Sequence, residues 1–203
     1  PRPRLAAVAR RLHRRGWMTG TAGNLSARLD DGSLWISASG KDKGRLRRRD
    51  FLRLGTGGEV LERGSEDSRP SAETAIHQAV YALFPTARAC LHVHTIPSNL
   101  AARLTAGEEL PLPPLEMLKG LGIPEEEPRV GVAVFPNHAH APAIAAEIAA
   151  RFAAAPPRLP GLLVRDHGLT VWAGDLETGV HYLELFDYLF AYLTAARASG
   201  IGW

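Results

Sequence analysis

Apolar residues recur along this chain with two different periods, and each period predicts a different element. Leu5, Val8 and Leu12 share one helical face of residues 4–15 and arginines occupy the other, so an amphipathic helix is expected there. Short aliphatic and β-branched runs bounded by Gly, Asp or Pro predict strands. We expect further helices at about 71–84, 98–104, 140–154 and 175–199. We expect strands at about 24–29, 34–37, 51–54, 59–61, 87–94, 130–135, 162–165 and 169–172.

Turn signals between the early strands indicate hairpins, at residues 30–32 and again in the glycine-rich segment 55–58. Strands near the start, followed by strands mixed with helices, predict an α/β fold: a three-layer α/β/α sandwich with helices on both faces of a central sheet. Because closely spaced hairpins argue against an all-parallel sheet, the sheet should be mixed and largely antiparallel. No repeat or low-complexity linker divides the chain, so residues 1–203 are expected to form a single domain.

Composition narrows the class of protein. The 203 residues are 45% hydrophobic and 22% charged, as in ordinary globular proteins. No apolar run is long enough to span a membrane and no signal peptide is evident, so no membrane partner is expected. The one cysteine, Cys90, excludes an intrachain disulfide and fits a cytoplasmic protein. The net charge of +3 comes from arginines spread along the whole chain, so no nucleic-acid partner is expected either.

A pair of histidines in an apolar run is the first indication of a functional site. His92 and His94 are two residues apart in a predicted strand, so their side chains should point to the same face. A third histidine, His167, follows another apolar run. Three imidazoles with one open position form a common site for a catalytic divalent metal, most often zinc. The alternative is a pair of structural histidines on a strand, each with its hydrogen bonds satisfied.

Three polar segments could cradle a phosphate. Residues 21–26 and 37–41 are rich in Gly, Ser and Asn or Lys and adjoin predicted strands, and residues 70–73 precede a predicted helix for which Ser71 is a plausible N-cap. Each segment offers hydroxyls, backbone N–H groups or a helix N-terminus. Taken alone, each is an ordinary turn or cap, and only their combination in this order indicates a function.

This ordered set of motifs resembles the class II aldolase/adducin family. The resemblance runs from about residue 20 to 192 and rests on five motifs: Gly23-Asn24-Leu25-Ser26, Ser39-Gly40, Ser71-Ala72-Glu73 with His77, His92-x-His94, and Asp166-His167-Gly168. It implies a class II aldolase-like fold, a ketose phosphate substrate and a C4-symmetric homotetramer. It also implies one Zn²⁺ per subunit held by His92, His94 and His167. The implied phosphate ligands are Asn24, Ser39, Gly40 and Ser71, with Lys41 as a further candidate.

One segment resembles a particular branch of the family. Glu116 begins a Glu-Met-x-Lys-Gly stretch 22 residues after His94. Such a segment is similar to that of the branch that removes water from a ketopentose 1-phosphate bearing a methylthio group at C5. The resemblance implies that Glu116 is the acid/base that moves a proton from C3 to the leaving C4 hydroxyl. Without this resemblance, the simplest interpretation of Glu116 is a surface carboxylate in a Pro-rich loop.

The implied chemistry places demands on the surroundings of Glu116. The C3 proton is acidic only when a Lewis acid polarises the adjacent C2 ketone. A group that acts first as base and then as acid works best with a pKa raised toward neutrality. Leu115 and Met117 could supply the desolvation that raises it, whereas Lys119 would oppose the shift if it lay close.

Glu73 keeps several roles open. It could be a fourth metal ligand, a second catalytic base, or a carboxylate favoured by the helix dipole at the start of its helix. In the alternative reading, a class II ketose-phosphate aldolase or epimerase, Glu73 would be the key carboxylate. A third reading, a non-catalytic adducin-like assembly domain, is opposed by the intact histidines.

The remaining histidines predict structure rather than chemistry. His138 and His140 repeat the spacing of the first pair, but they lie between a proline and an alanine-rich helix and are expected to be solvated. His77 falls one turn after Glu73 and is expected to pack or cap.

Overall fold

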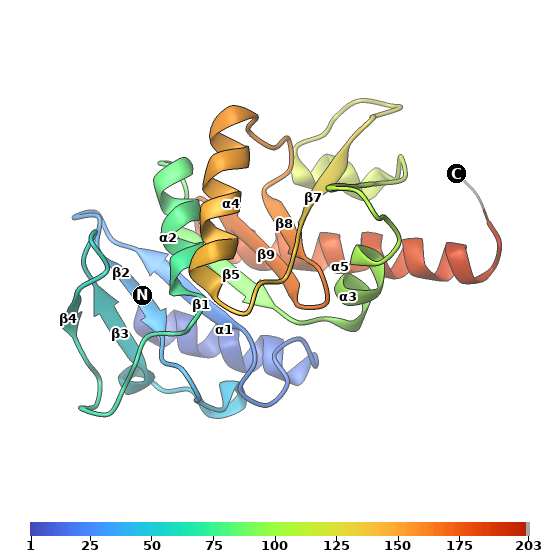
Figure 1. Cartoon of the computed structure of the whole chain (residues 1–203). Helices are drawn as coiled ribbons and strands as arrows, with labels where there is room; N and C mark the ends of the chain where they lie inside the picture. Colours follow the sequence, from blue (N-terminus) through green and yellow to red (C-terminus); the bar gives the residue numbers. More distant parts are fainter. Residues whose placement is uncertain (202–203) are drawn as a thin grey trace.

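The computed structural model describes residues 1–201 and builds them around a nine-stranded sheet (Figure 1). The strand order is β4-β3-β2-β1-β5-β9-β8-β7-β6, and β7 and β8 form its parallel pair. The sheet is therefore mixed and largely antiparallel, as predicted. Its strands are β1 Asn24–Arg28, β2 Leu34–Ser37, β3 Phe51–Leu54, β4 Val60–Glu62, β5 Ala89–Val93, β6 Glu109–Pro111, β7 Gly131–Phe135, β8 Gly161–Val164 and β9 Gly168–Ala173.

Helices cover both faces of this sheet and complete the predicted three layers (Figure 1). One apolar cluster joins the sheet to α1, α3 and α5, and a second cluster joins it to the mutually packed α2 and α4. The helices are α1 Arg2–Arg14, α2 Thr74–Leu83, α3 Ile96–Ala102, α4 Ala141–Ala154 and α5 Leu176–Ala198. Three short 3₁₀ helices lie between them: η1 Lys43–Arg45, η2 Arg48–Asp50 and η3 Glu116–Leu121.

Alternation along the central strands decides which side chains meet which helix layer. In β5, Leu91 and Val93 belong to the cluster under α1, α3 and α5, whereas Cys90 belongs to the cluster under α2 and α4. His92 has the same parity as Cys90 and so faces the α2 layer. The start of α2 and the end of β5 are thereby brought to the same face of the sheet.

The start of α2 differs from the prediction. Ser71 does not cap the helix, because the helix begins at Thr74 and Glu73 occupies the N-cap position. Residues 71–73 form a turn, in which the backbone N–H of Thr74 donates to the carbonyl oxygen of Ser71 at 3.1 Å. The Glu73 side chain makes no capping hydrogen bond and contacts His167 instead.

Candidate metal centre and phosphate pocket

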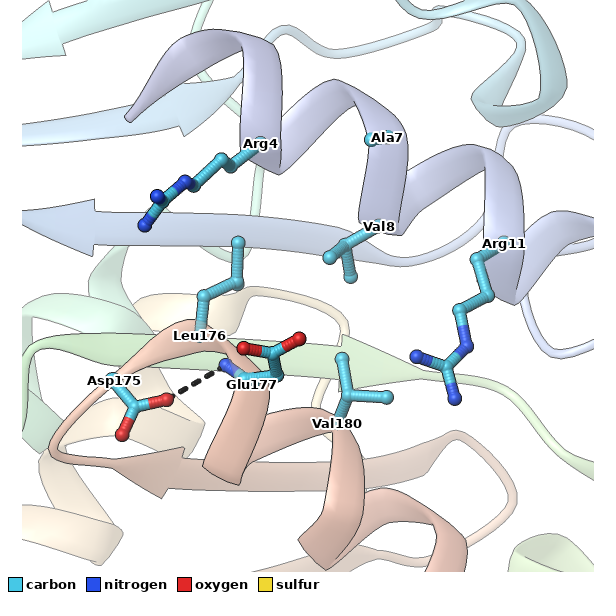
Figure 2. Close-up of a pocket in the computed structure, with 8 residues that line it drawn as sticks. All are labelled: Arg4, Ala7, Val8, Arg11, Asp175, Leu176, Glu177 and Val180. Carbon is cyan, nitrogen blue, oxygen red and sulfur yellow. Dashed lines mark hydrogen bonds between the residues drawn. The ribbon is translucent and has the colours of Figure 1, made fainter.

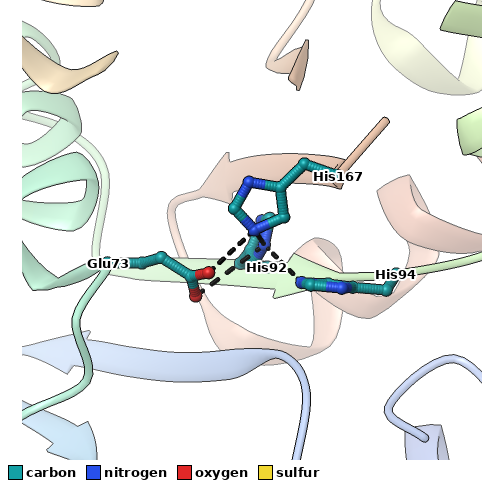
Figure 3. Close-up of side chains that lie close together, drawn as sticks. All are labelled: Glu73, His92, His94 and His167. Atoms are coloured by element: carbon teal, nitrogen blue, oxygen red, sulfur yellow. Dashed lines mark hydrogen bonds and ion pairs between the residues drawn. The ribbon is translucent and has the colours of Figure 1, made fainter. Parts of the chain in front are cut away.

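The three predicted histidines converge on one point (Figure 3). His92 lies in β5, His94 follows directly after the strand, and His167 lies in the turn between β8 and β9. The Nε2 atom of His92 is 2.9 Å from that of His94 and 3.3 Å from that of His167. Pairing of β5 with β9 brings His167 close, because the two strands are neighbours in the sheet.

The turn that carries His167 is shaped by the residues on either side of it. Asp166 adopts a left-handed conformation with φ of 54°, which suits a short polar side chain. Gly168 passes so close to β5 that an added Cβ would lie 2.2 Å from the carbonyl oxygen of Val93. The Asn99 side chain donates to the carbonyl oxygen of His167 at 3.2 Å and ties the turn to α3.

Glu73 reaches the same point from the start of α2 (Figure 3). Its Oε1 atom is 2.8 Å from Nε2 of His167, and its Oε2 atom is 3.8 Å from Nε2 of His92. Burial acts to raise the pKa of Glu73, but the hydrogen bond to His167 and the electrostatic interaction with the surrounding imidazoles more than offset it. The pKa of Glu73 is therefore well below its ordinary value, and the carboxylate is negatively charged.

Burial keeps the strand histidines neutral. It lowers the pKa of His92 to about 3, and it also lowers the pKa of His94. The Nδ1 atom of His92 lies 2.9 Å from the hydroxyl of Thr170, a fully buried residue of β9. With an N–H on Nδ1 donating to Thr170, the Nε2 lone pair of His92 points into the cluster.

The donor set fits a tetrahedral transition metal. One atom from each of His92, His94, His167 and Glu73 lies within 4.8 Å of the others. Ligands around a tetrahedral ion with bonds of 2.0–2.1 Å stand about 3.3 Å apart, close to the separations between the histidine nitrogens. Neutral imidazoles with one carboxylate suit Zn²⁺ and several related divalent ions. No second cluster of this kind occurs among residues 1–201, and His138 pairs instead with Glu147 at 2.6 Å.

A buried chain of hydrogen bonds leads from Glu73 away from the histidine cluster and fixes the position of its carboxylate. The Asn24 amide nitrogen donates to the Glu73 carboxylate, and the Asn24 amide oxygen faces Nε2 of His77. Nδ1 of His77 lies 2.7 Å from the Ser26 hydroxyl, which is 2.8 Å from the Tyr81 hydroxyl. A carboxylate only accepts, so the amide nitrogen must face Glu73 and His77 must carry its proton on Nε2. Burial lowers the pKa of His77 to about 4, consistent with this neutral form.

A hollow of about 230 Å³ adjoins the histidines. Its polar lining comes from the three segments predicted to hold phosphate, namely 21–23, 38–40 and 71–73, together with Lys43 and His94. Ser39, Gly40 and Ser71, three of the predicted phosphate ligands, line this hollow. Since Glu73 and His94 also line it, the hollow and the metal-binding cluster form one continuous site.

Two predicted phosphate ligands lie differently. The Asn24 side chain is 1% exposed and its amide is used by Glu73, His77 and Ser71 rather than by the hollow. Lys41 lines a separate surface hollow among arginine and aspartate side chains. Lys43, two residues on, enters the pocket in its place. The run from Lys41 to Lys43 does not show which of the two lysines turns inward.

Glu116 lies apart from the histidine cluster in this single chain. It begins η3, its side chain is 80% exposed, and it pairs with Lys119 at 3.0 Å. Leu115 and Met117 do not cover the Glu116 carboxylate, because both pack against the apolar cluster under α1, α3 and α5. Lys119, the neighbour whose distance the sequence left open, is in direct contact with the Glu116 carboxylate.

A larger hollow of about 350 Å³ lies between α1 and the start of α5 (Figure 2). Arg4 and Arg11 stand on one side, Asp175 and Glu177 on the other, and Val8, Leu176 and Val180 line the floor. Asp175 already caps α5 by accepting from the backbone N–H groups of Glu177 and Thr178. The hollow contains no histidine and is separate from the candidate metal centre.

Comparison with known proteins places this fold and donor set in a class. The sequence model of the Class II Aldolase and Adducin N-terminal domain matches residues 3–194, so the chain belongs to this family. In structure, the chain is similar to YgbL from Escherichia coli, with a TM-score of 0.79 and 23% identity over 96% of this chain and 88% of that one. It is also similar to L-fuculose-1-phosphate aldolase from Thermus thermophilus, with a TM-score of 0.71 and 24% identity over 98% and 96%. These similarities confirm the predicted fold.

Relatives in sequence point to one branch of the family. A methylthioribulose-1-phosphate dehydratase of Microcystis aeruginosa is 55% identical over 97% of this chain and 96% of its own length. Proteins of the same name from Leptospira biflexa and Klebsiella pneumoniae are 42% and 40% identical, over 87% and 92% of this chain and 88% and 93% of their own lengths. Within residues 1–201, no helix combines the length and the apolar character needed to cross a membrane.

Proposed function

We propose that this chain is a metal-dependent lyase that dehydrates 5-methylthioribulose 1-phosphate to 2,3-diketo-5-methylthiopentyl 1-phosphate, a step of methionine salvage. The observation that carries the proposal is the meeting of His92, His94, His167 and Glu73 beside a pocket of hydroxyls and backbone amides. The 55% identity to a dehydratase of that name supports this branch over an aldolase or epimerase.

The proposed cofactor is one Zn²⁺ per subunit, held by His92, His94 and His167. When bound, the ion supplies a Lewis acid that makes the C3 proton of the ketose removable. Thr170 keeps the binding nitrogen of His92 free, and the buried chain from Tyr81 to Asn24 keeps Glu73 beside the histidines. Glu73 offers a fourth ligand, a use that its lowered pKa favours because the carboxylate stays charged.

The phosphate of the substrate is proposed to bind in the adjoining pocket. Ser39 and Ser71 offer hydroxyls and Gly40 offers a backbone N–H, because all three line the hollow. Gly23 also lines it, and only glycine fits there: its φ is +76°, and an added Cβ would lie 2.8 Å from the carbonyl oxygen of His92. In this arrangement Asn24 acts indirectly, by positioning Glu73.

Glu116 is proposed to move the proton. It removes the C3 proton and returns it to the departing C4 hydroxyl, which leaves as water. The resulting enol of C3 and C4 tautomerises to the 2,3-diketone. Because Glu116 is exposed and belongs neither to the histidine cluster nor to the hollow beside it within one chain, we propose that it acts at the histidines of a neighbouring subunit in a homotetramer.

An exposed apolar surface supports assembly. Ile96 and Leu100 of α3 are 76% and 51% exposed, and Tyr188 and Tyr192 of the adjacent α5 are 51% and 37% exposed. A surface of this kind marks an interface more often than open solvent. It borders the site, since Ile96 is two residues from His94. The proposed compartment is the cytoplasm, where the buried free thiol of Cys90 stays reduced.

The direct test is turnover of the methylthio sugar phosphate by the metal-loaded protein. The proposal expects a new dicarbonyl absorbance and no aldehyde fragment, whereas an aldolase would release an aldehyde. A complementation test addresses the shared site: Glu116→Gln and His167→Ala are each expected to be inactive alone. Mixed oligomers of the two should regain part of the activity, because some sites then combine intact residues from two subunits. No recovery in verified mixed oligomers would place Glu116 in its own subunit's site or outside the mechanism.

A further inference from the structure

Lys43 is a buried lysine at the phosphate pocket that the sequence motifs did not single out. It is one of only three lysines in the chain. Lys43 is 2% exposed, and its side chain lines the same hollow as Ser39, Gly40 and Ser71. The ammonium donates to the carbonyl oxygens of Thr21 at 2.7 Å and Lys41 at 3.0 Å.

The ammonium of Lys43 has unused capacity. It carries three N–H donors, and the two carbonyl oxygens take two of them. Within residues 1–201 it forms no ion pair with a carboxylate, although Glu73 and Asp42 lie near enough to act on its charge. A buried cation without a paired anion is costly, and the cost falls when an anion binds next to it. The arrangement is typical of a site completed by an anionic ligand.

The polar lining around Lys43 selects the kind of anion. The pocket offers hydroxyls and backbone N–H groups on several sides, and Lys43 is the one lysine or arginine among its lining residues. Such a set suits a tetrahedral oxyanion with several acceptor oxygens. Glu73 and His94 line the same hollow, so a phosphate near Lys43 would leave the carbon chain of the ligand directed toward the histidines.

We propose that Lys43 binds the phosphate group of the substrate and sets the preference for phosphorylated over phosphate-free ketoses. The identity of that substrate rests on the proposed function, but phosphate binding itself does not. The competing explanation is structural: Lys43 joins the loop at Thr21 to the loop at Lys41 and supports the pocket without touching the ligand.

Substitutions separate these two roles. Lys43→Gln removes the charge and keeps two N–H donors for the carbonyl oxygens. We expect this variant to bind inorganic phosphate about 10- to 100-fold more weakly, as for loss of one charge-assisted hydrogen bond. Inhibition by phosphate and calorimetry both measure this affinity. The kcat/KM for the phosphorylated ketose should fall by a similar factor, while that for the phosphate-free ketose stays nearly unchanged. Lys43→Arg should recover part of the phosphate affinity.

Matched controls remove a charge elsewhere on the same segment. Arg45 belongs to the same 3₁₀ turn but its side chain is 88% exposed, so Arg45→Met should leave phosphate affinity intact. Lys41→Met compares the two neighbouring lysines directly. Equal losses for both ketoses in Lys43→Gln, or a larger loss in Lys41→Met, would overturn the assignment.

A measurement on the unmodified chain guards against variants that fail to fold. With only three lysines, ¹³C-labelled lysine side chains give three resolvable signals. Inorganic phosphate should shift the Lys43 signal most, and an unshifted Lys43 signal at saturating phosphate would refute the proposal. A chain that binds phosphate through Lys43 yet leaves the methylthio ketose phosphate intact would contradict the proposed function and leave this inference standing.

Discussion

The hydroxyl of Thr170 offers a sharp test of how the metal centre is organised. Thr170→Val removes one hydrogen-bond acceptor from a fully buried position and changes the side-chain shape very little. In the native chain, Nδ1 of His92 lies 2.9 Å from this hydroxyl. The bond holds the imidazole in the tautomer that presents Nε2 to the cluster. Without it, the His92 ring can rotate or move its proton to Nε2.

The magnitude follows from two independent considerations. Leaving a buried N–H without an acceptor costs about 1–3 kcal/mol. Loss of a hydrogen bond behind a metal-ligating histidine weakens metal binding by about 10- to 100-fold, which corresponds to about 1.4–2.7 kcal/mol. The two ranges agree, so we expect Thr170→Val to bind Zn²⁺ about 10- to 100-fold more weakly than the native chain.

The assay is competition for Zn²⁺ against a chromophoric chelator, with circular dichroism to verify folding. Thr194→Val is the matched control: it deletes a hydroxyl that bonds only to the helix carbonyl oxygens of Phe190 and Ala191, both at 3.0 Å. Native-like zinc affinity in folded Thr170→Val would refute the argument that this hydroxyl orients His92.

Three further outcomes are expected. Glu116→Gln should retain bound metal and lose turnover, as metal analysis beside the dicarbonyl assay would show; full activity would remove Glu116 from the mechanism. Gly168→Ala should weaken metal binding and lower stability by about 1–3 kcal/mol, because the new Cβ meets the Val93 carbonyl oxygen; an unchanged melting temperature would contradict this. The metal-free protein should lose stability on acidification, because the pKa of His77 is about 4 when folded and near 6.5 when unfolded. The contribution of neutral His77 to the free energy of unfolding is complete above the unfolded pKa and falls by about 2 kcal/mol by about pH 5. Urea unfolding above the unfolded pKa and at about pH 5 measures this loss. A His77→Gln variant with an equally steep loss would exclude His77 as the source.

Local patterns predicted most of the elements and the histidines of the candidate metal centre. The strands at 34–37 and 51–54 have the predicted bounds, since alternation and turn residues are local signals. The histidine pair was visible because two residues on one strand share a face. His167 was a candidate because it follows another apolar run, but its approach to the pair depends on the pairing of β5 with β9, which no local pattern encodes.

The contacts of the supporting residues could not be found in this way. Thr170 is an ordinary residue type whose importance comes from burial beside His92. Ser26 and Lys43 belong to or adjoin motif segments, but the sequence does not show that their partners are His77 and the Thr21 carbonyl oxygen. His77 was expected to pack or cap, and it is indeed buried, but its contact with Asn24 gives it a place behind Glu73. The short strand β6 was missed, because three residues carry too little periodicity to be recognised.

X-ray absorption spectroscopy of the zinc-loaded protein counts the imidazoles that bind the ion. We expect three imidazole nitrogens about 2.0–2.1 Å from the ion in the native chain, and two after His167→Ala. A native spectrum with fewer imidazoles, or one that His167→Ala leaves unchanged, would show that the three histidines do not hold the metal together.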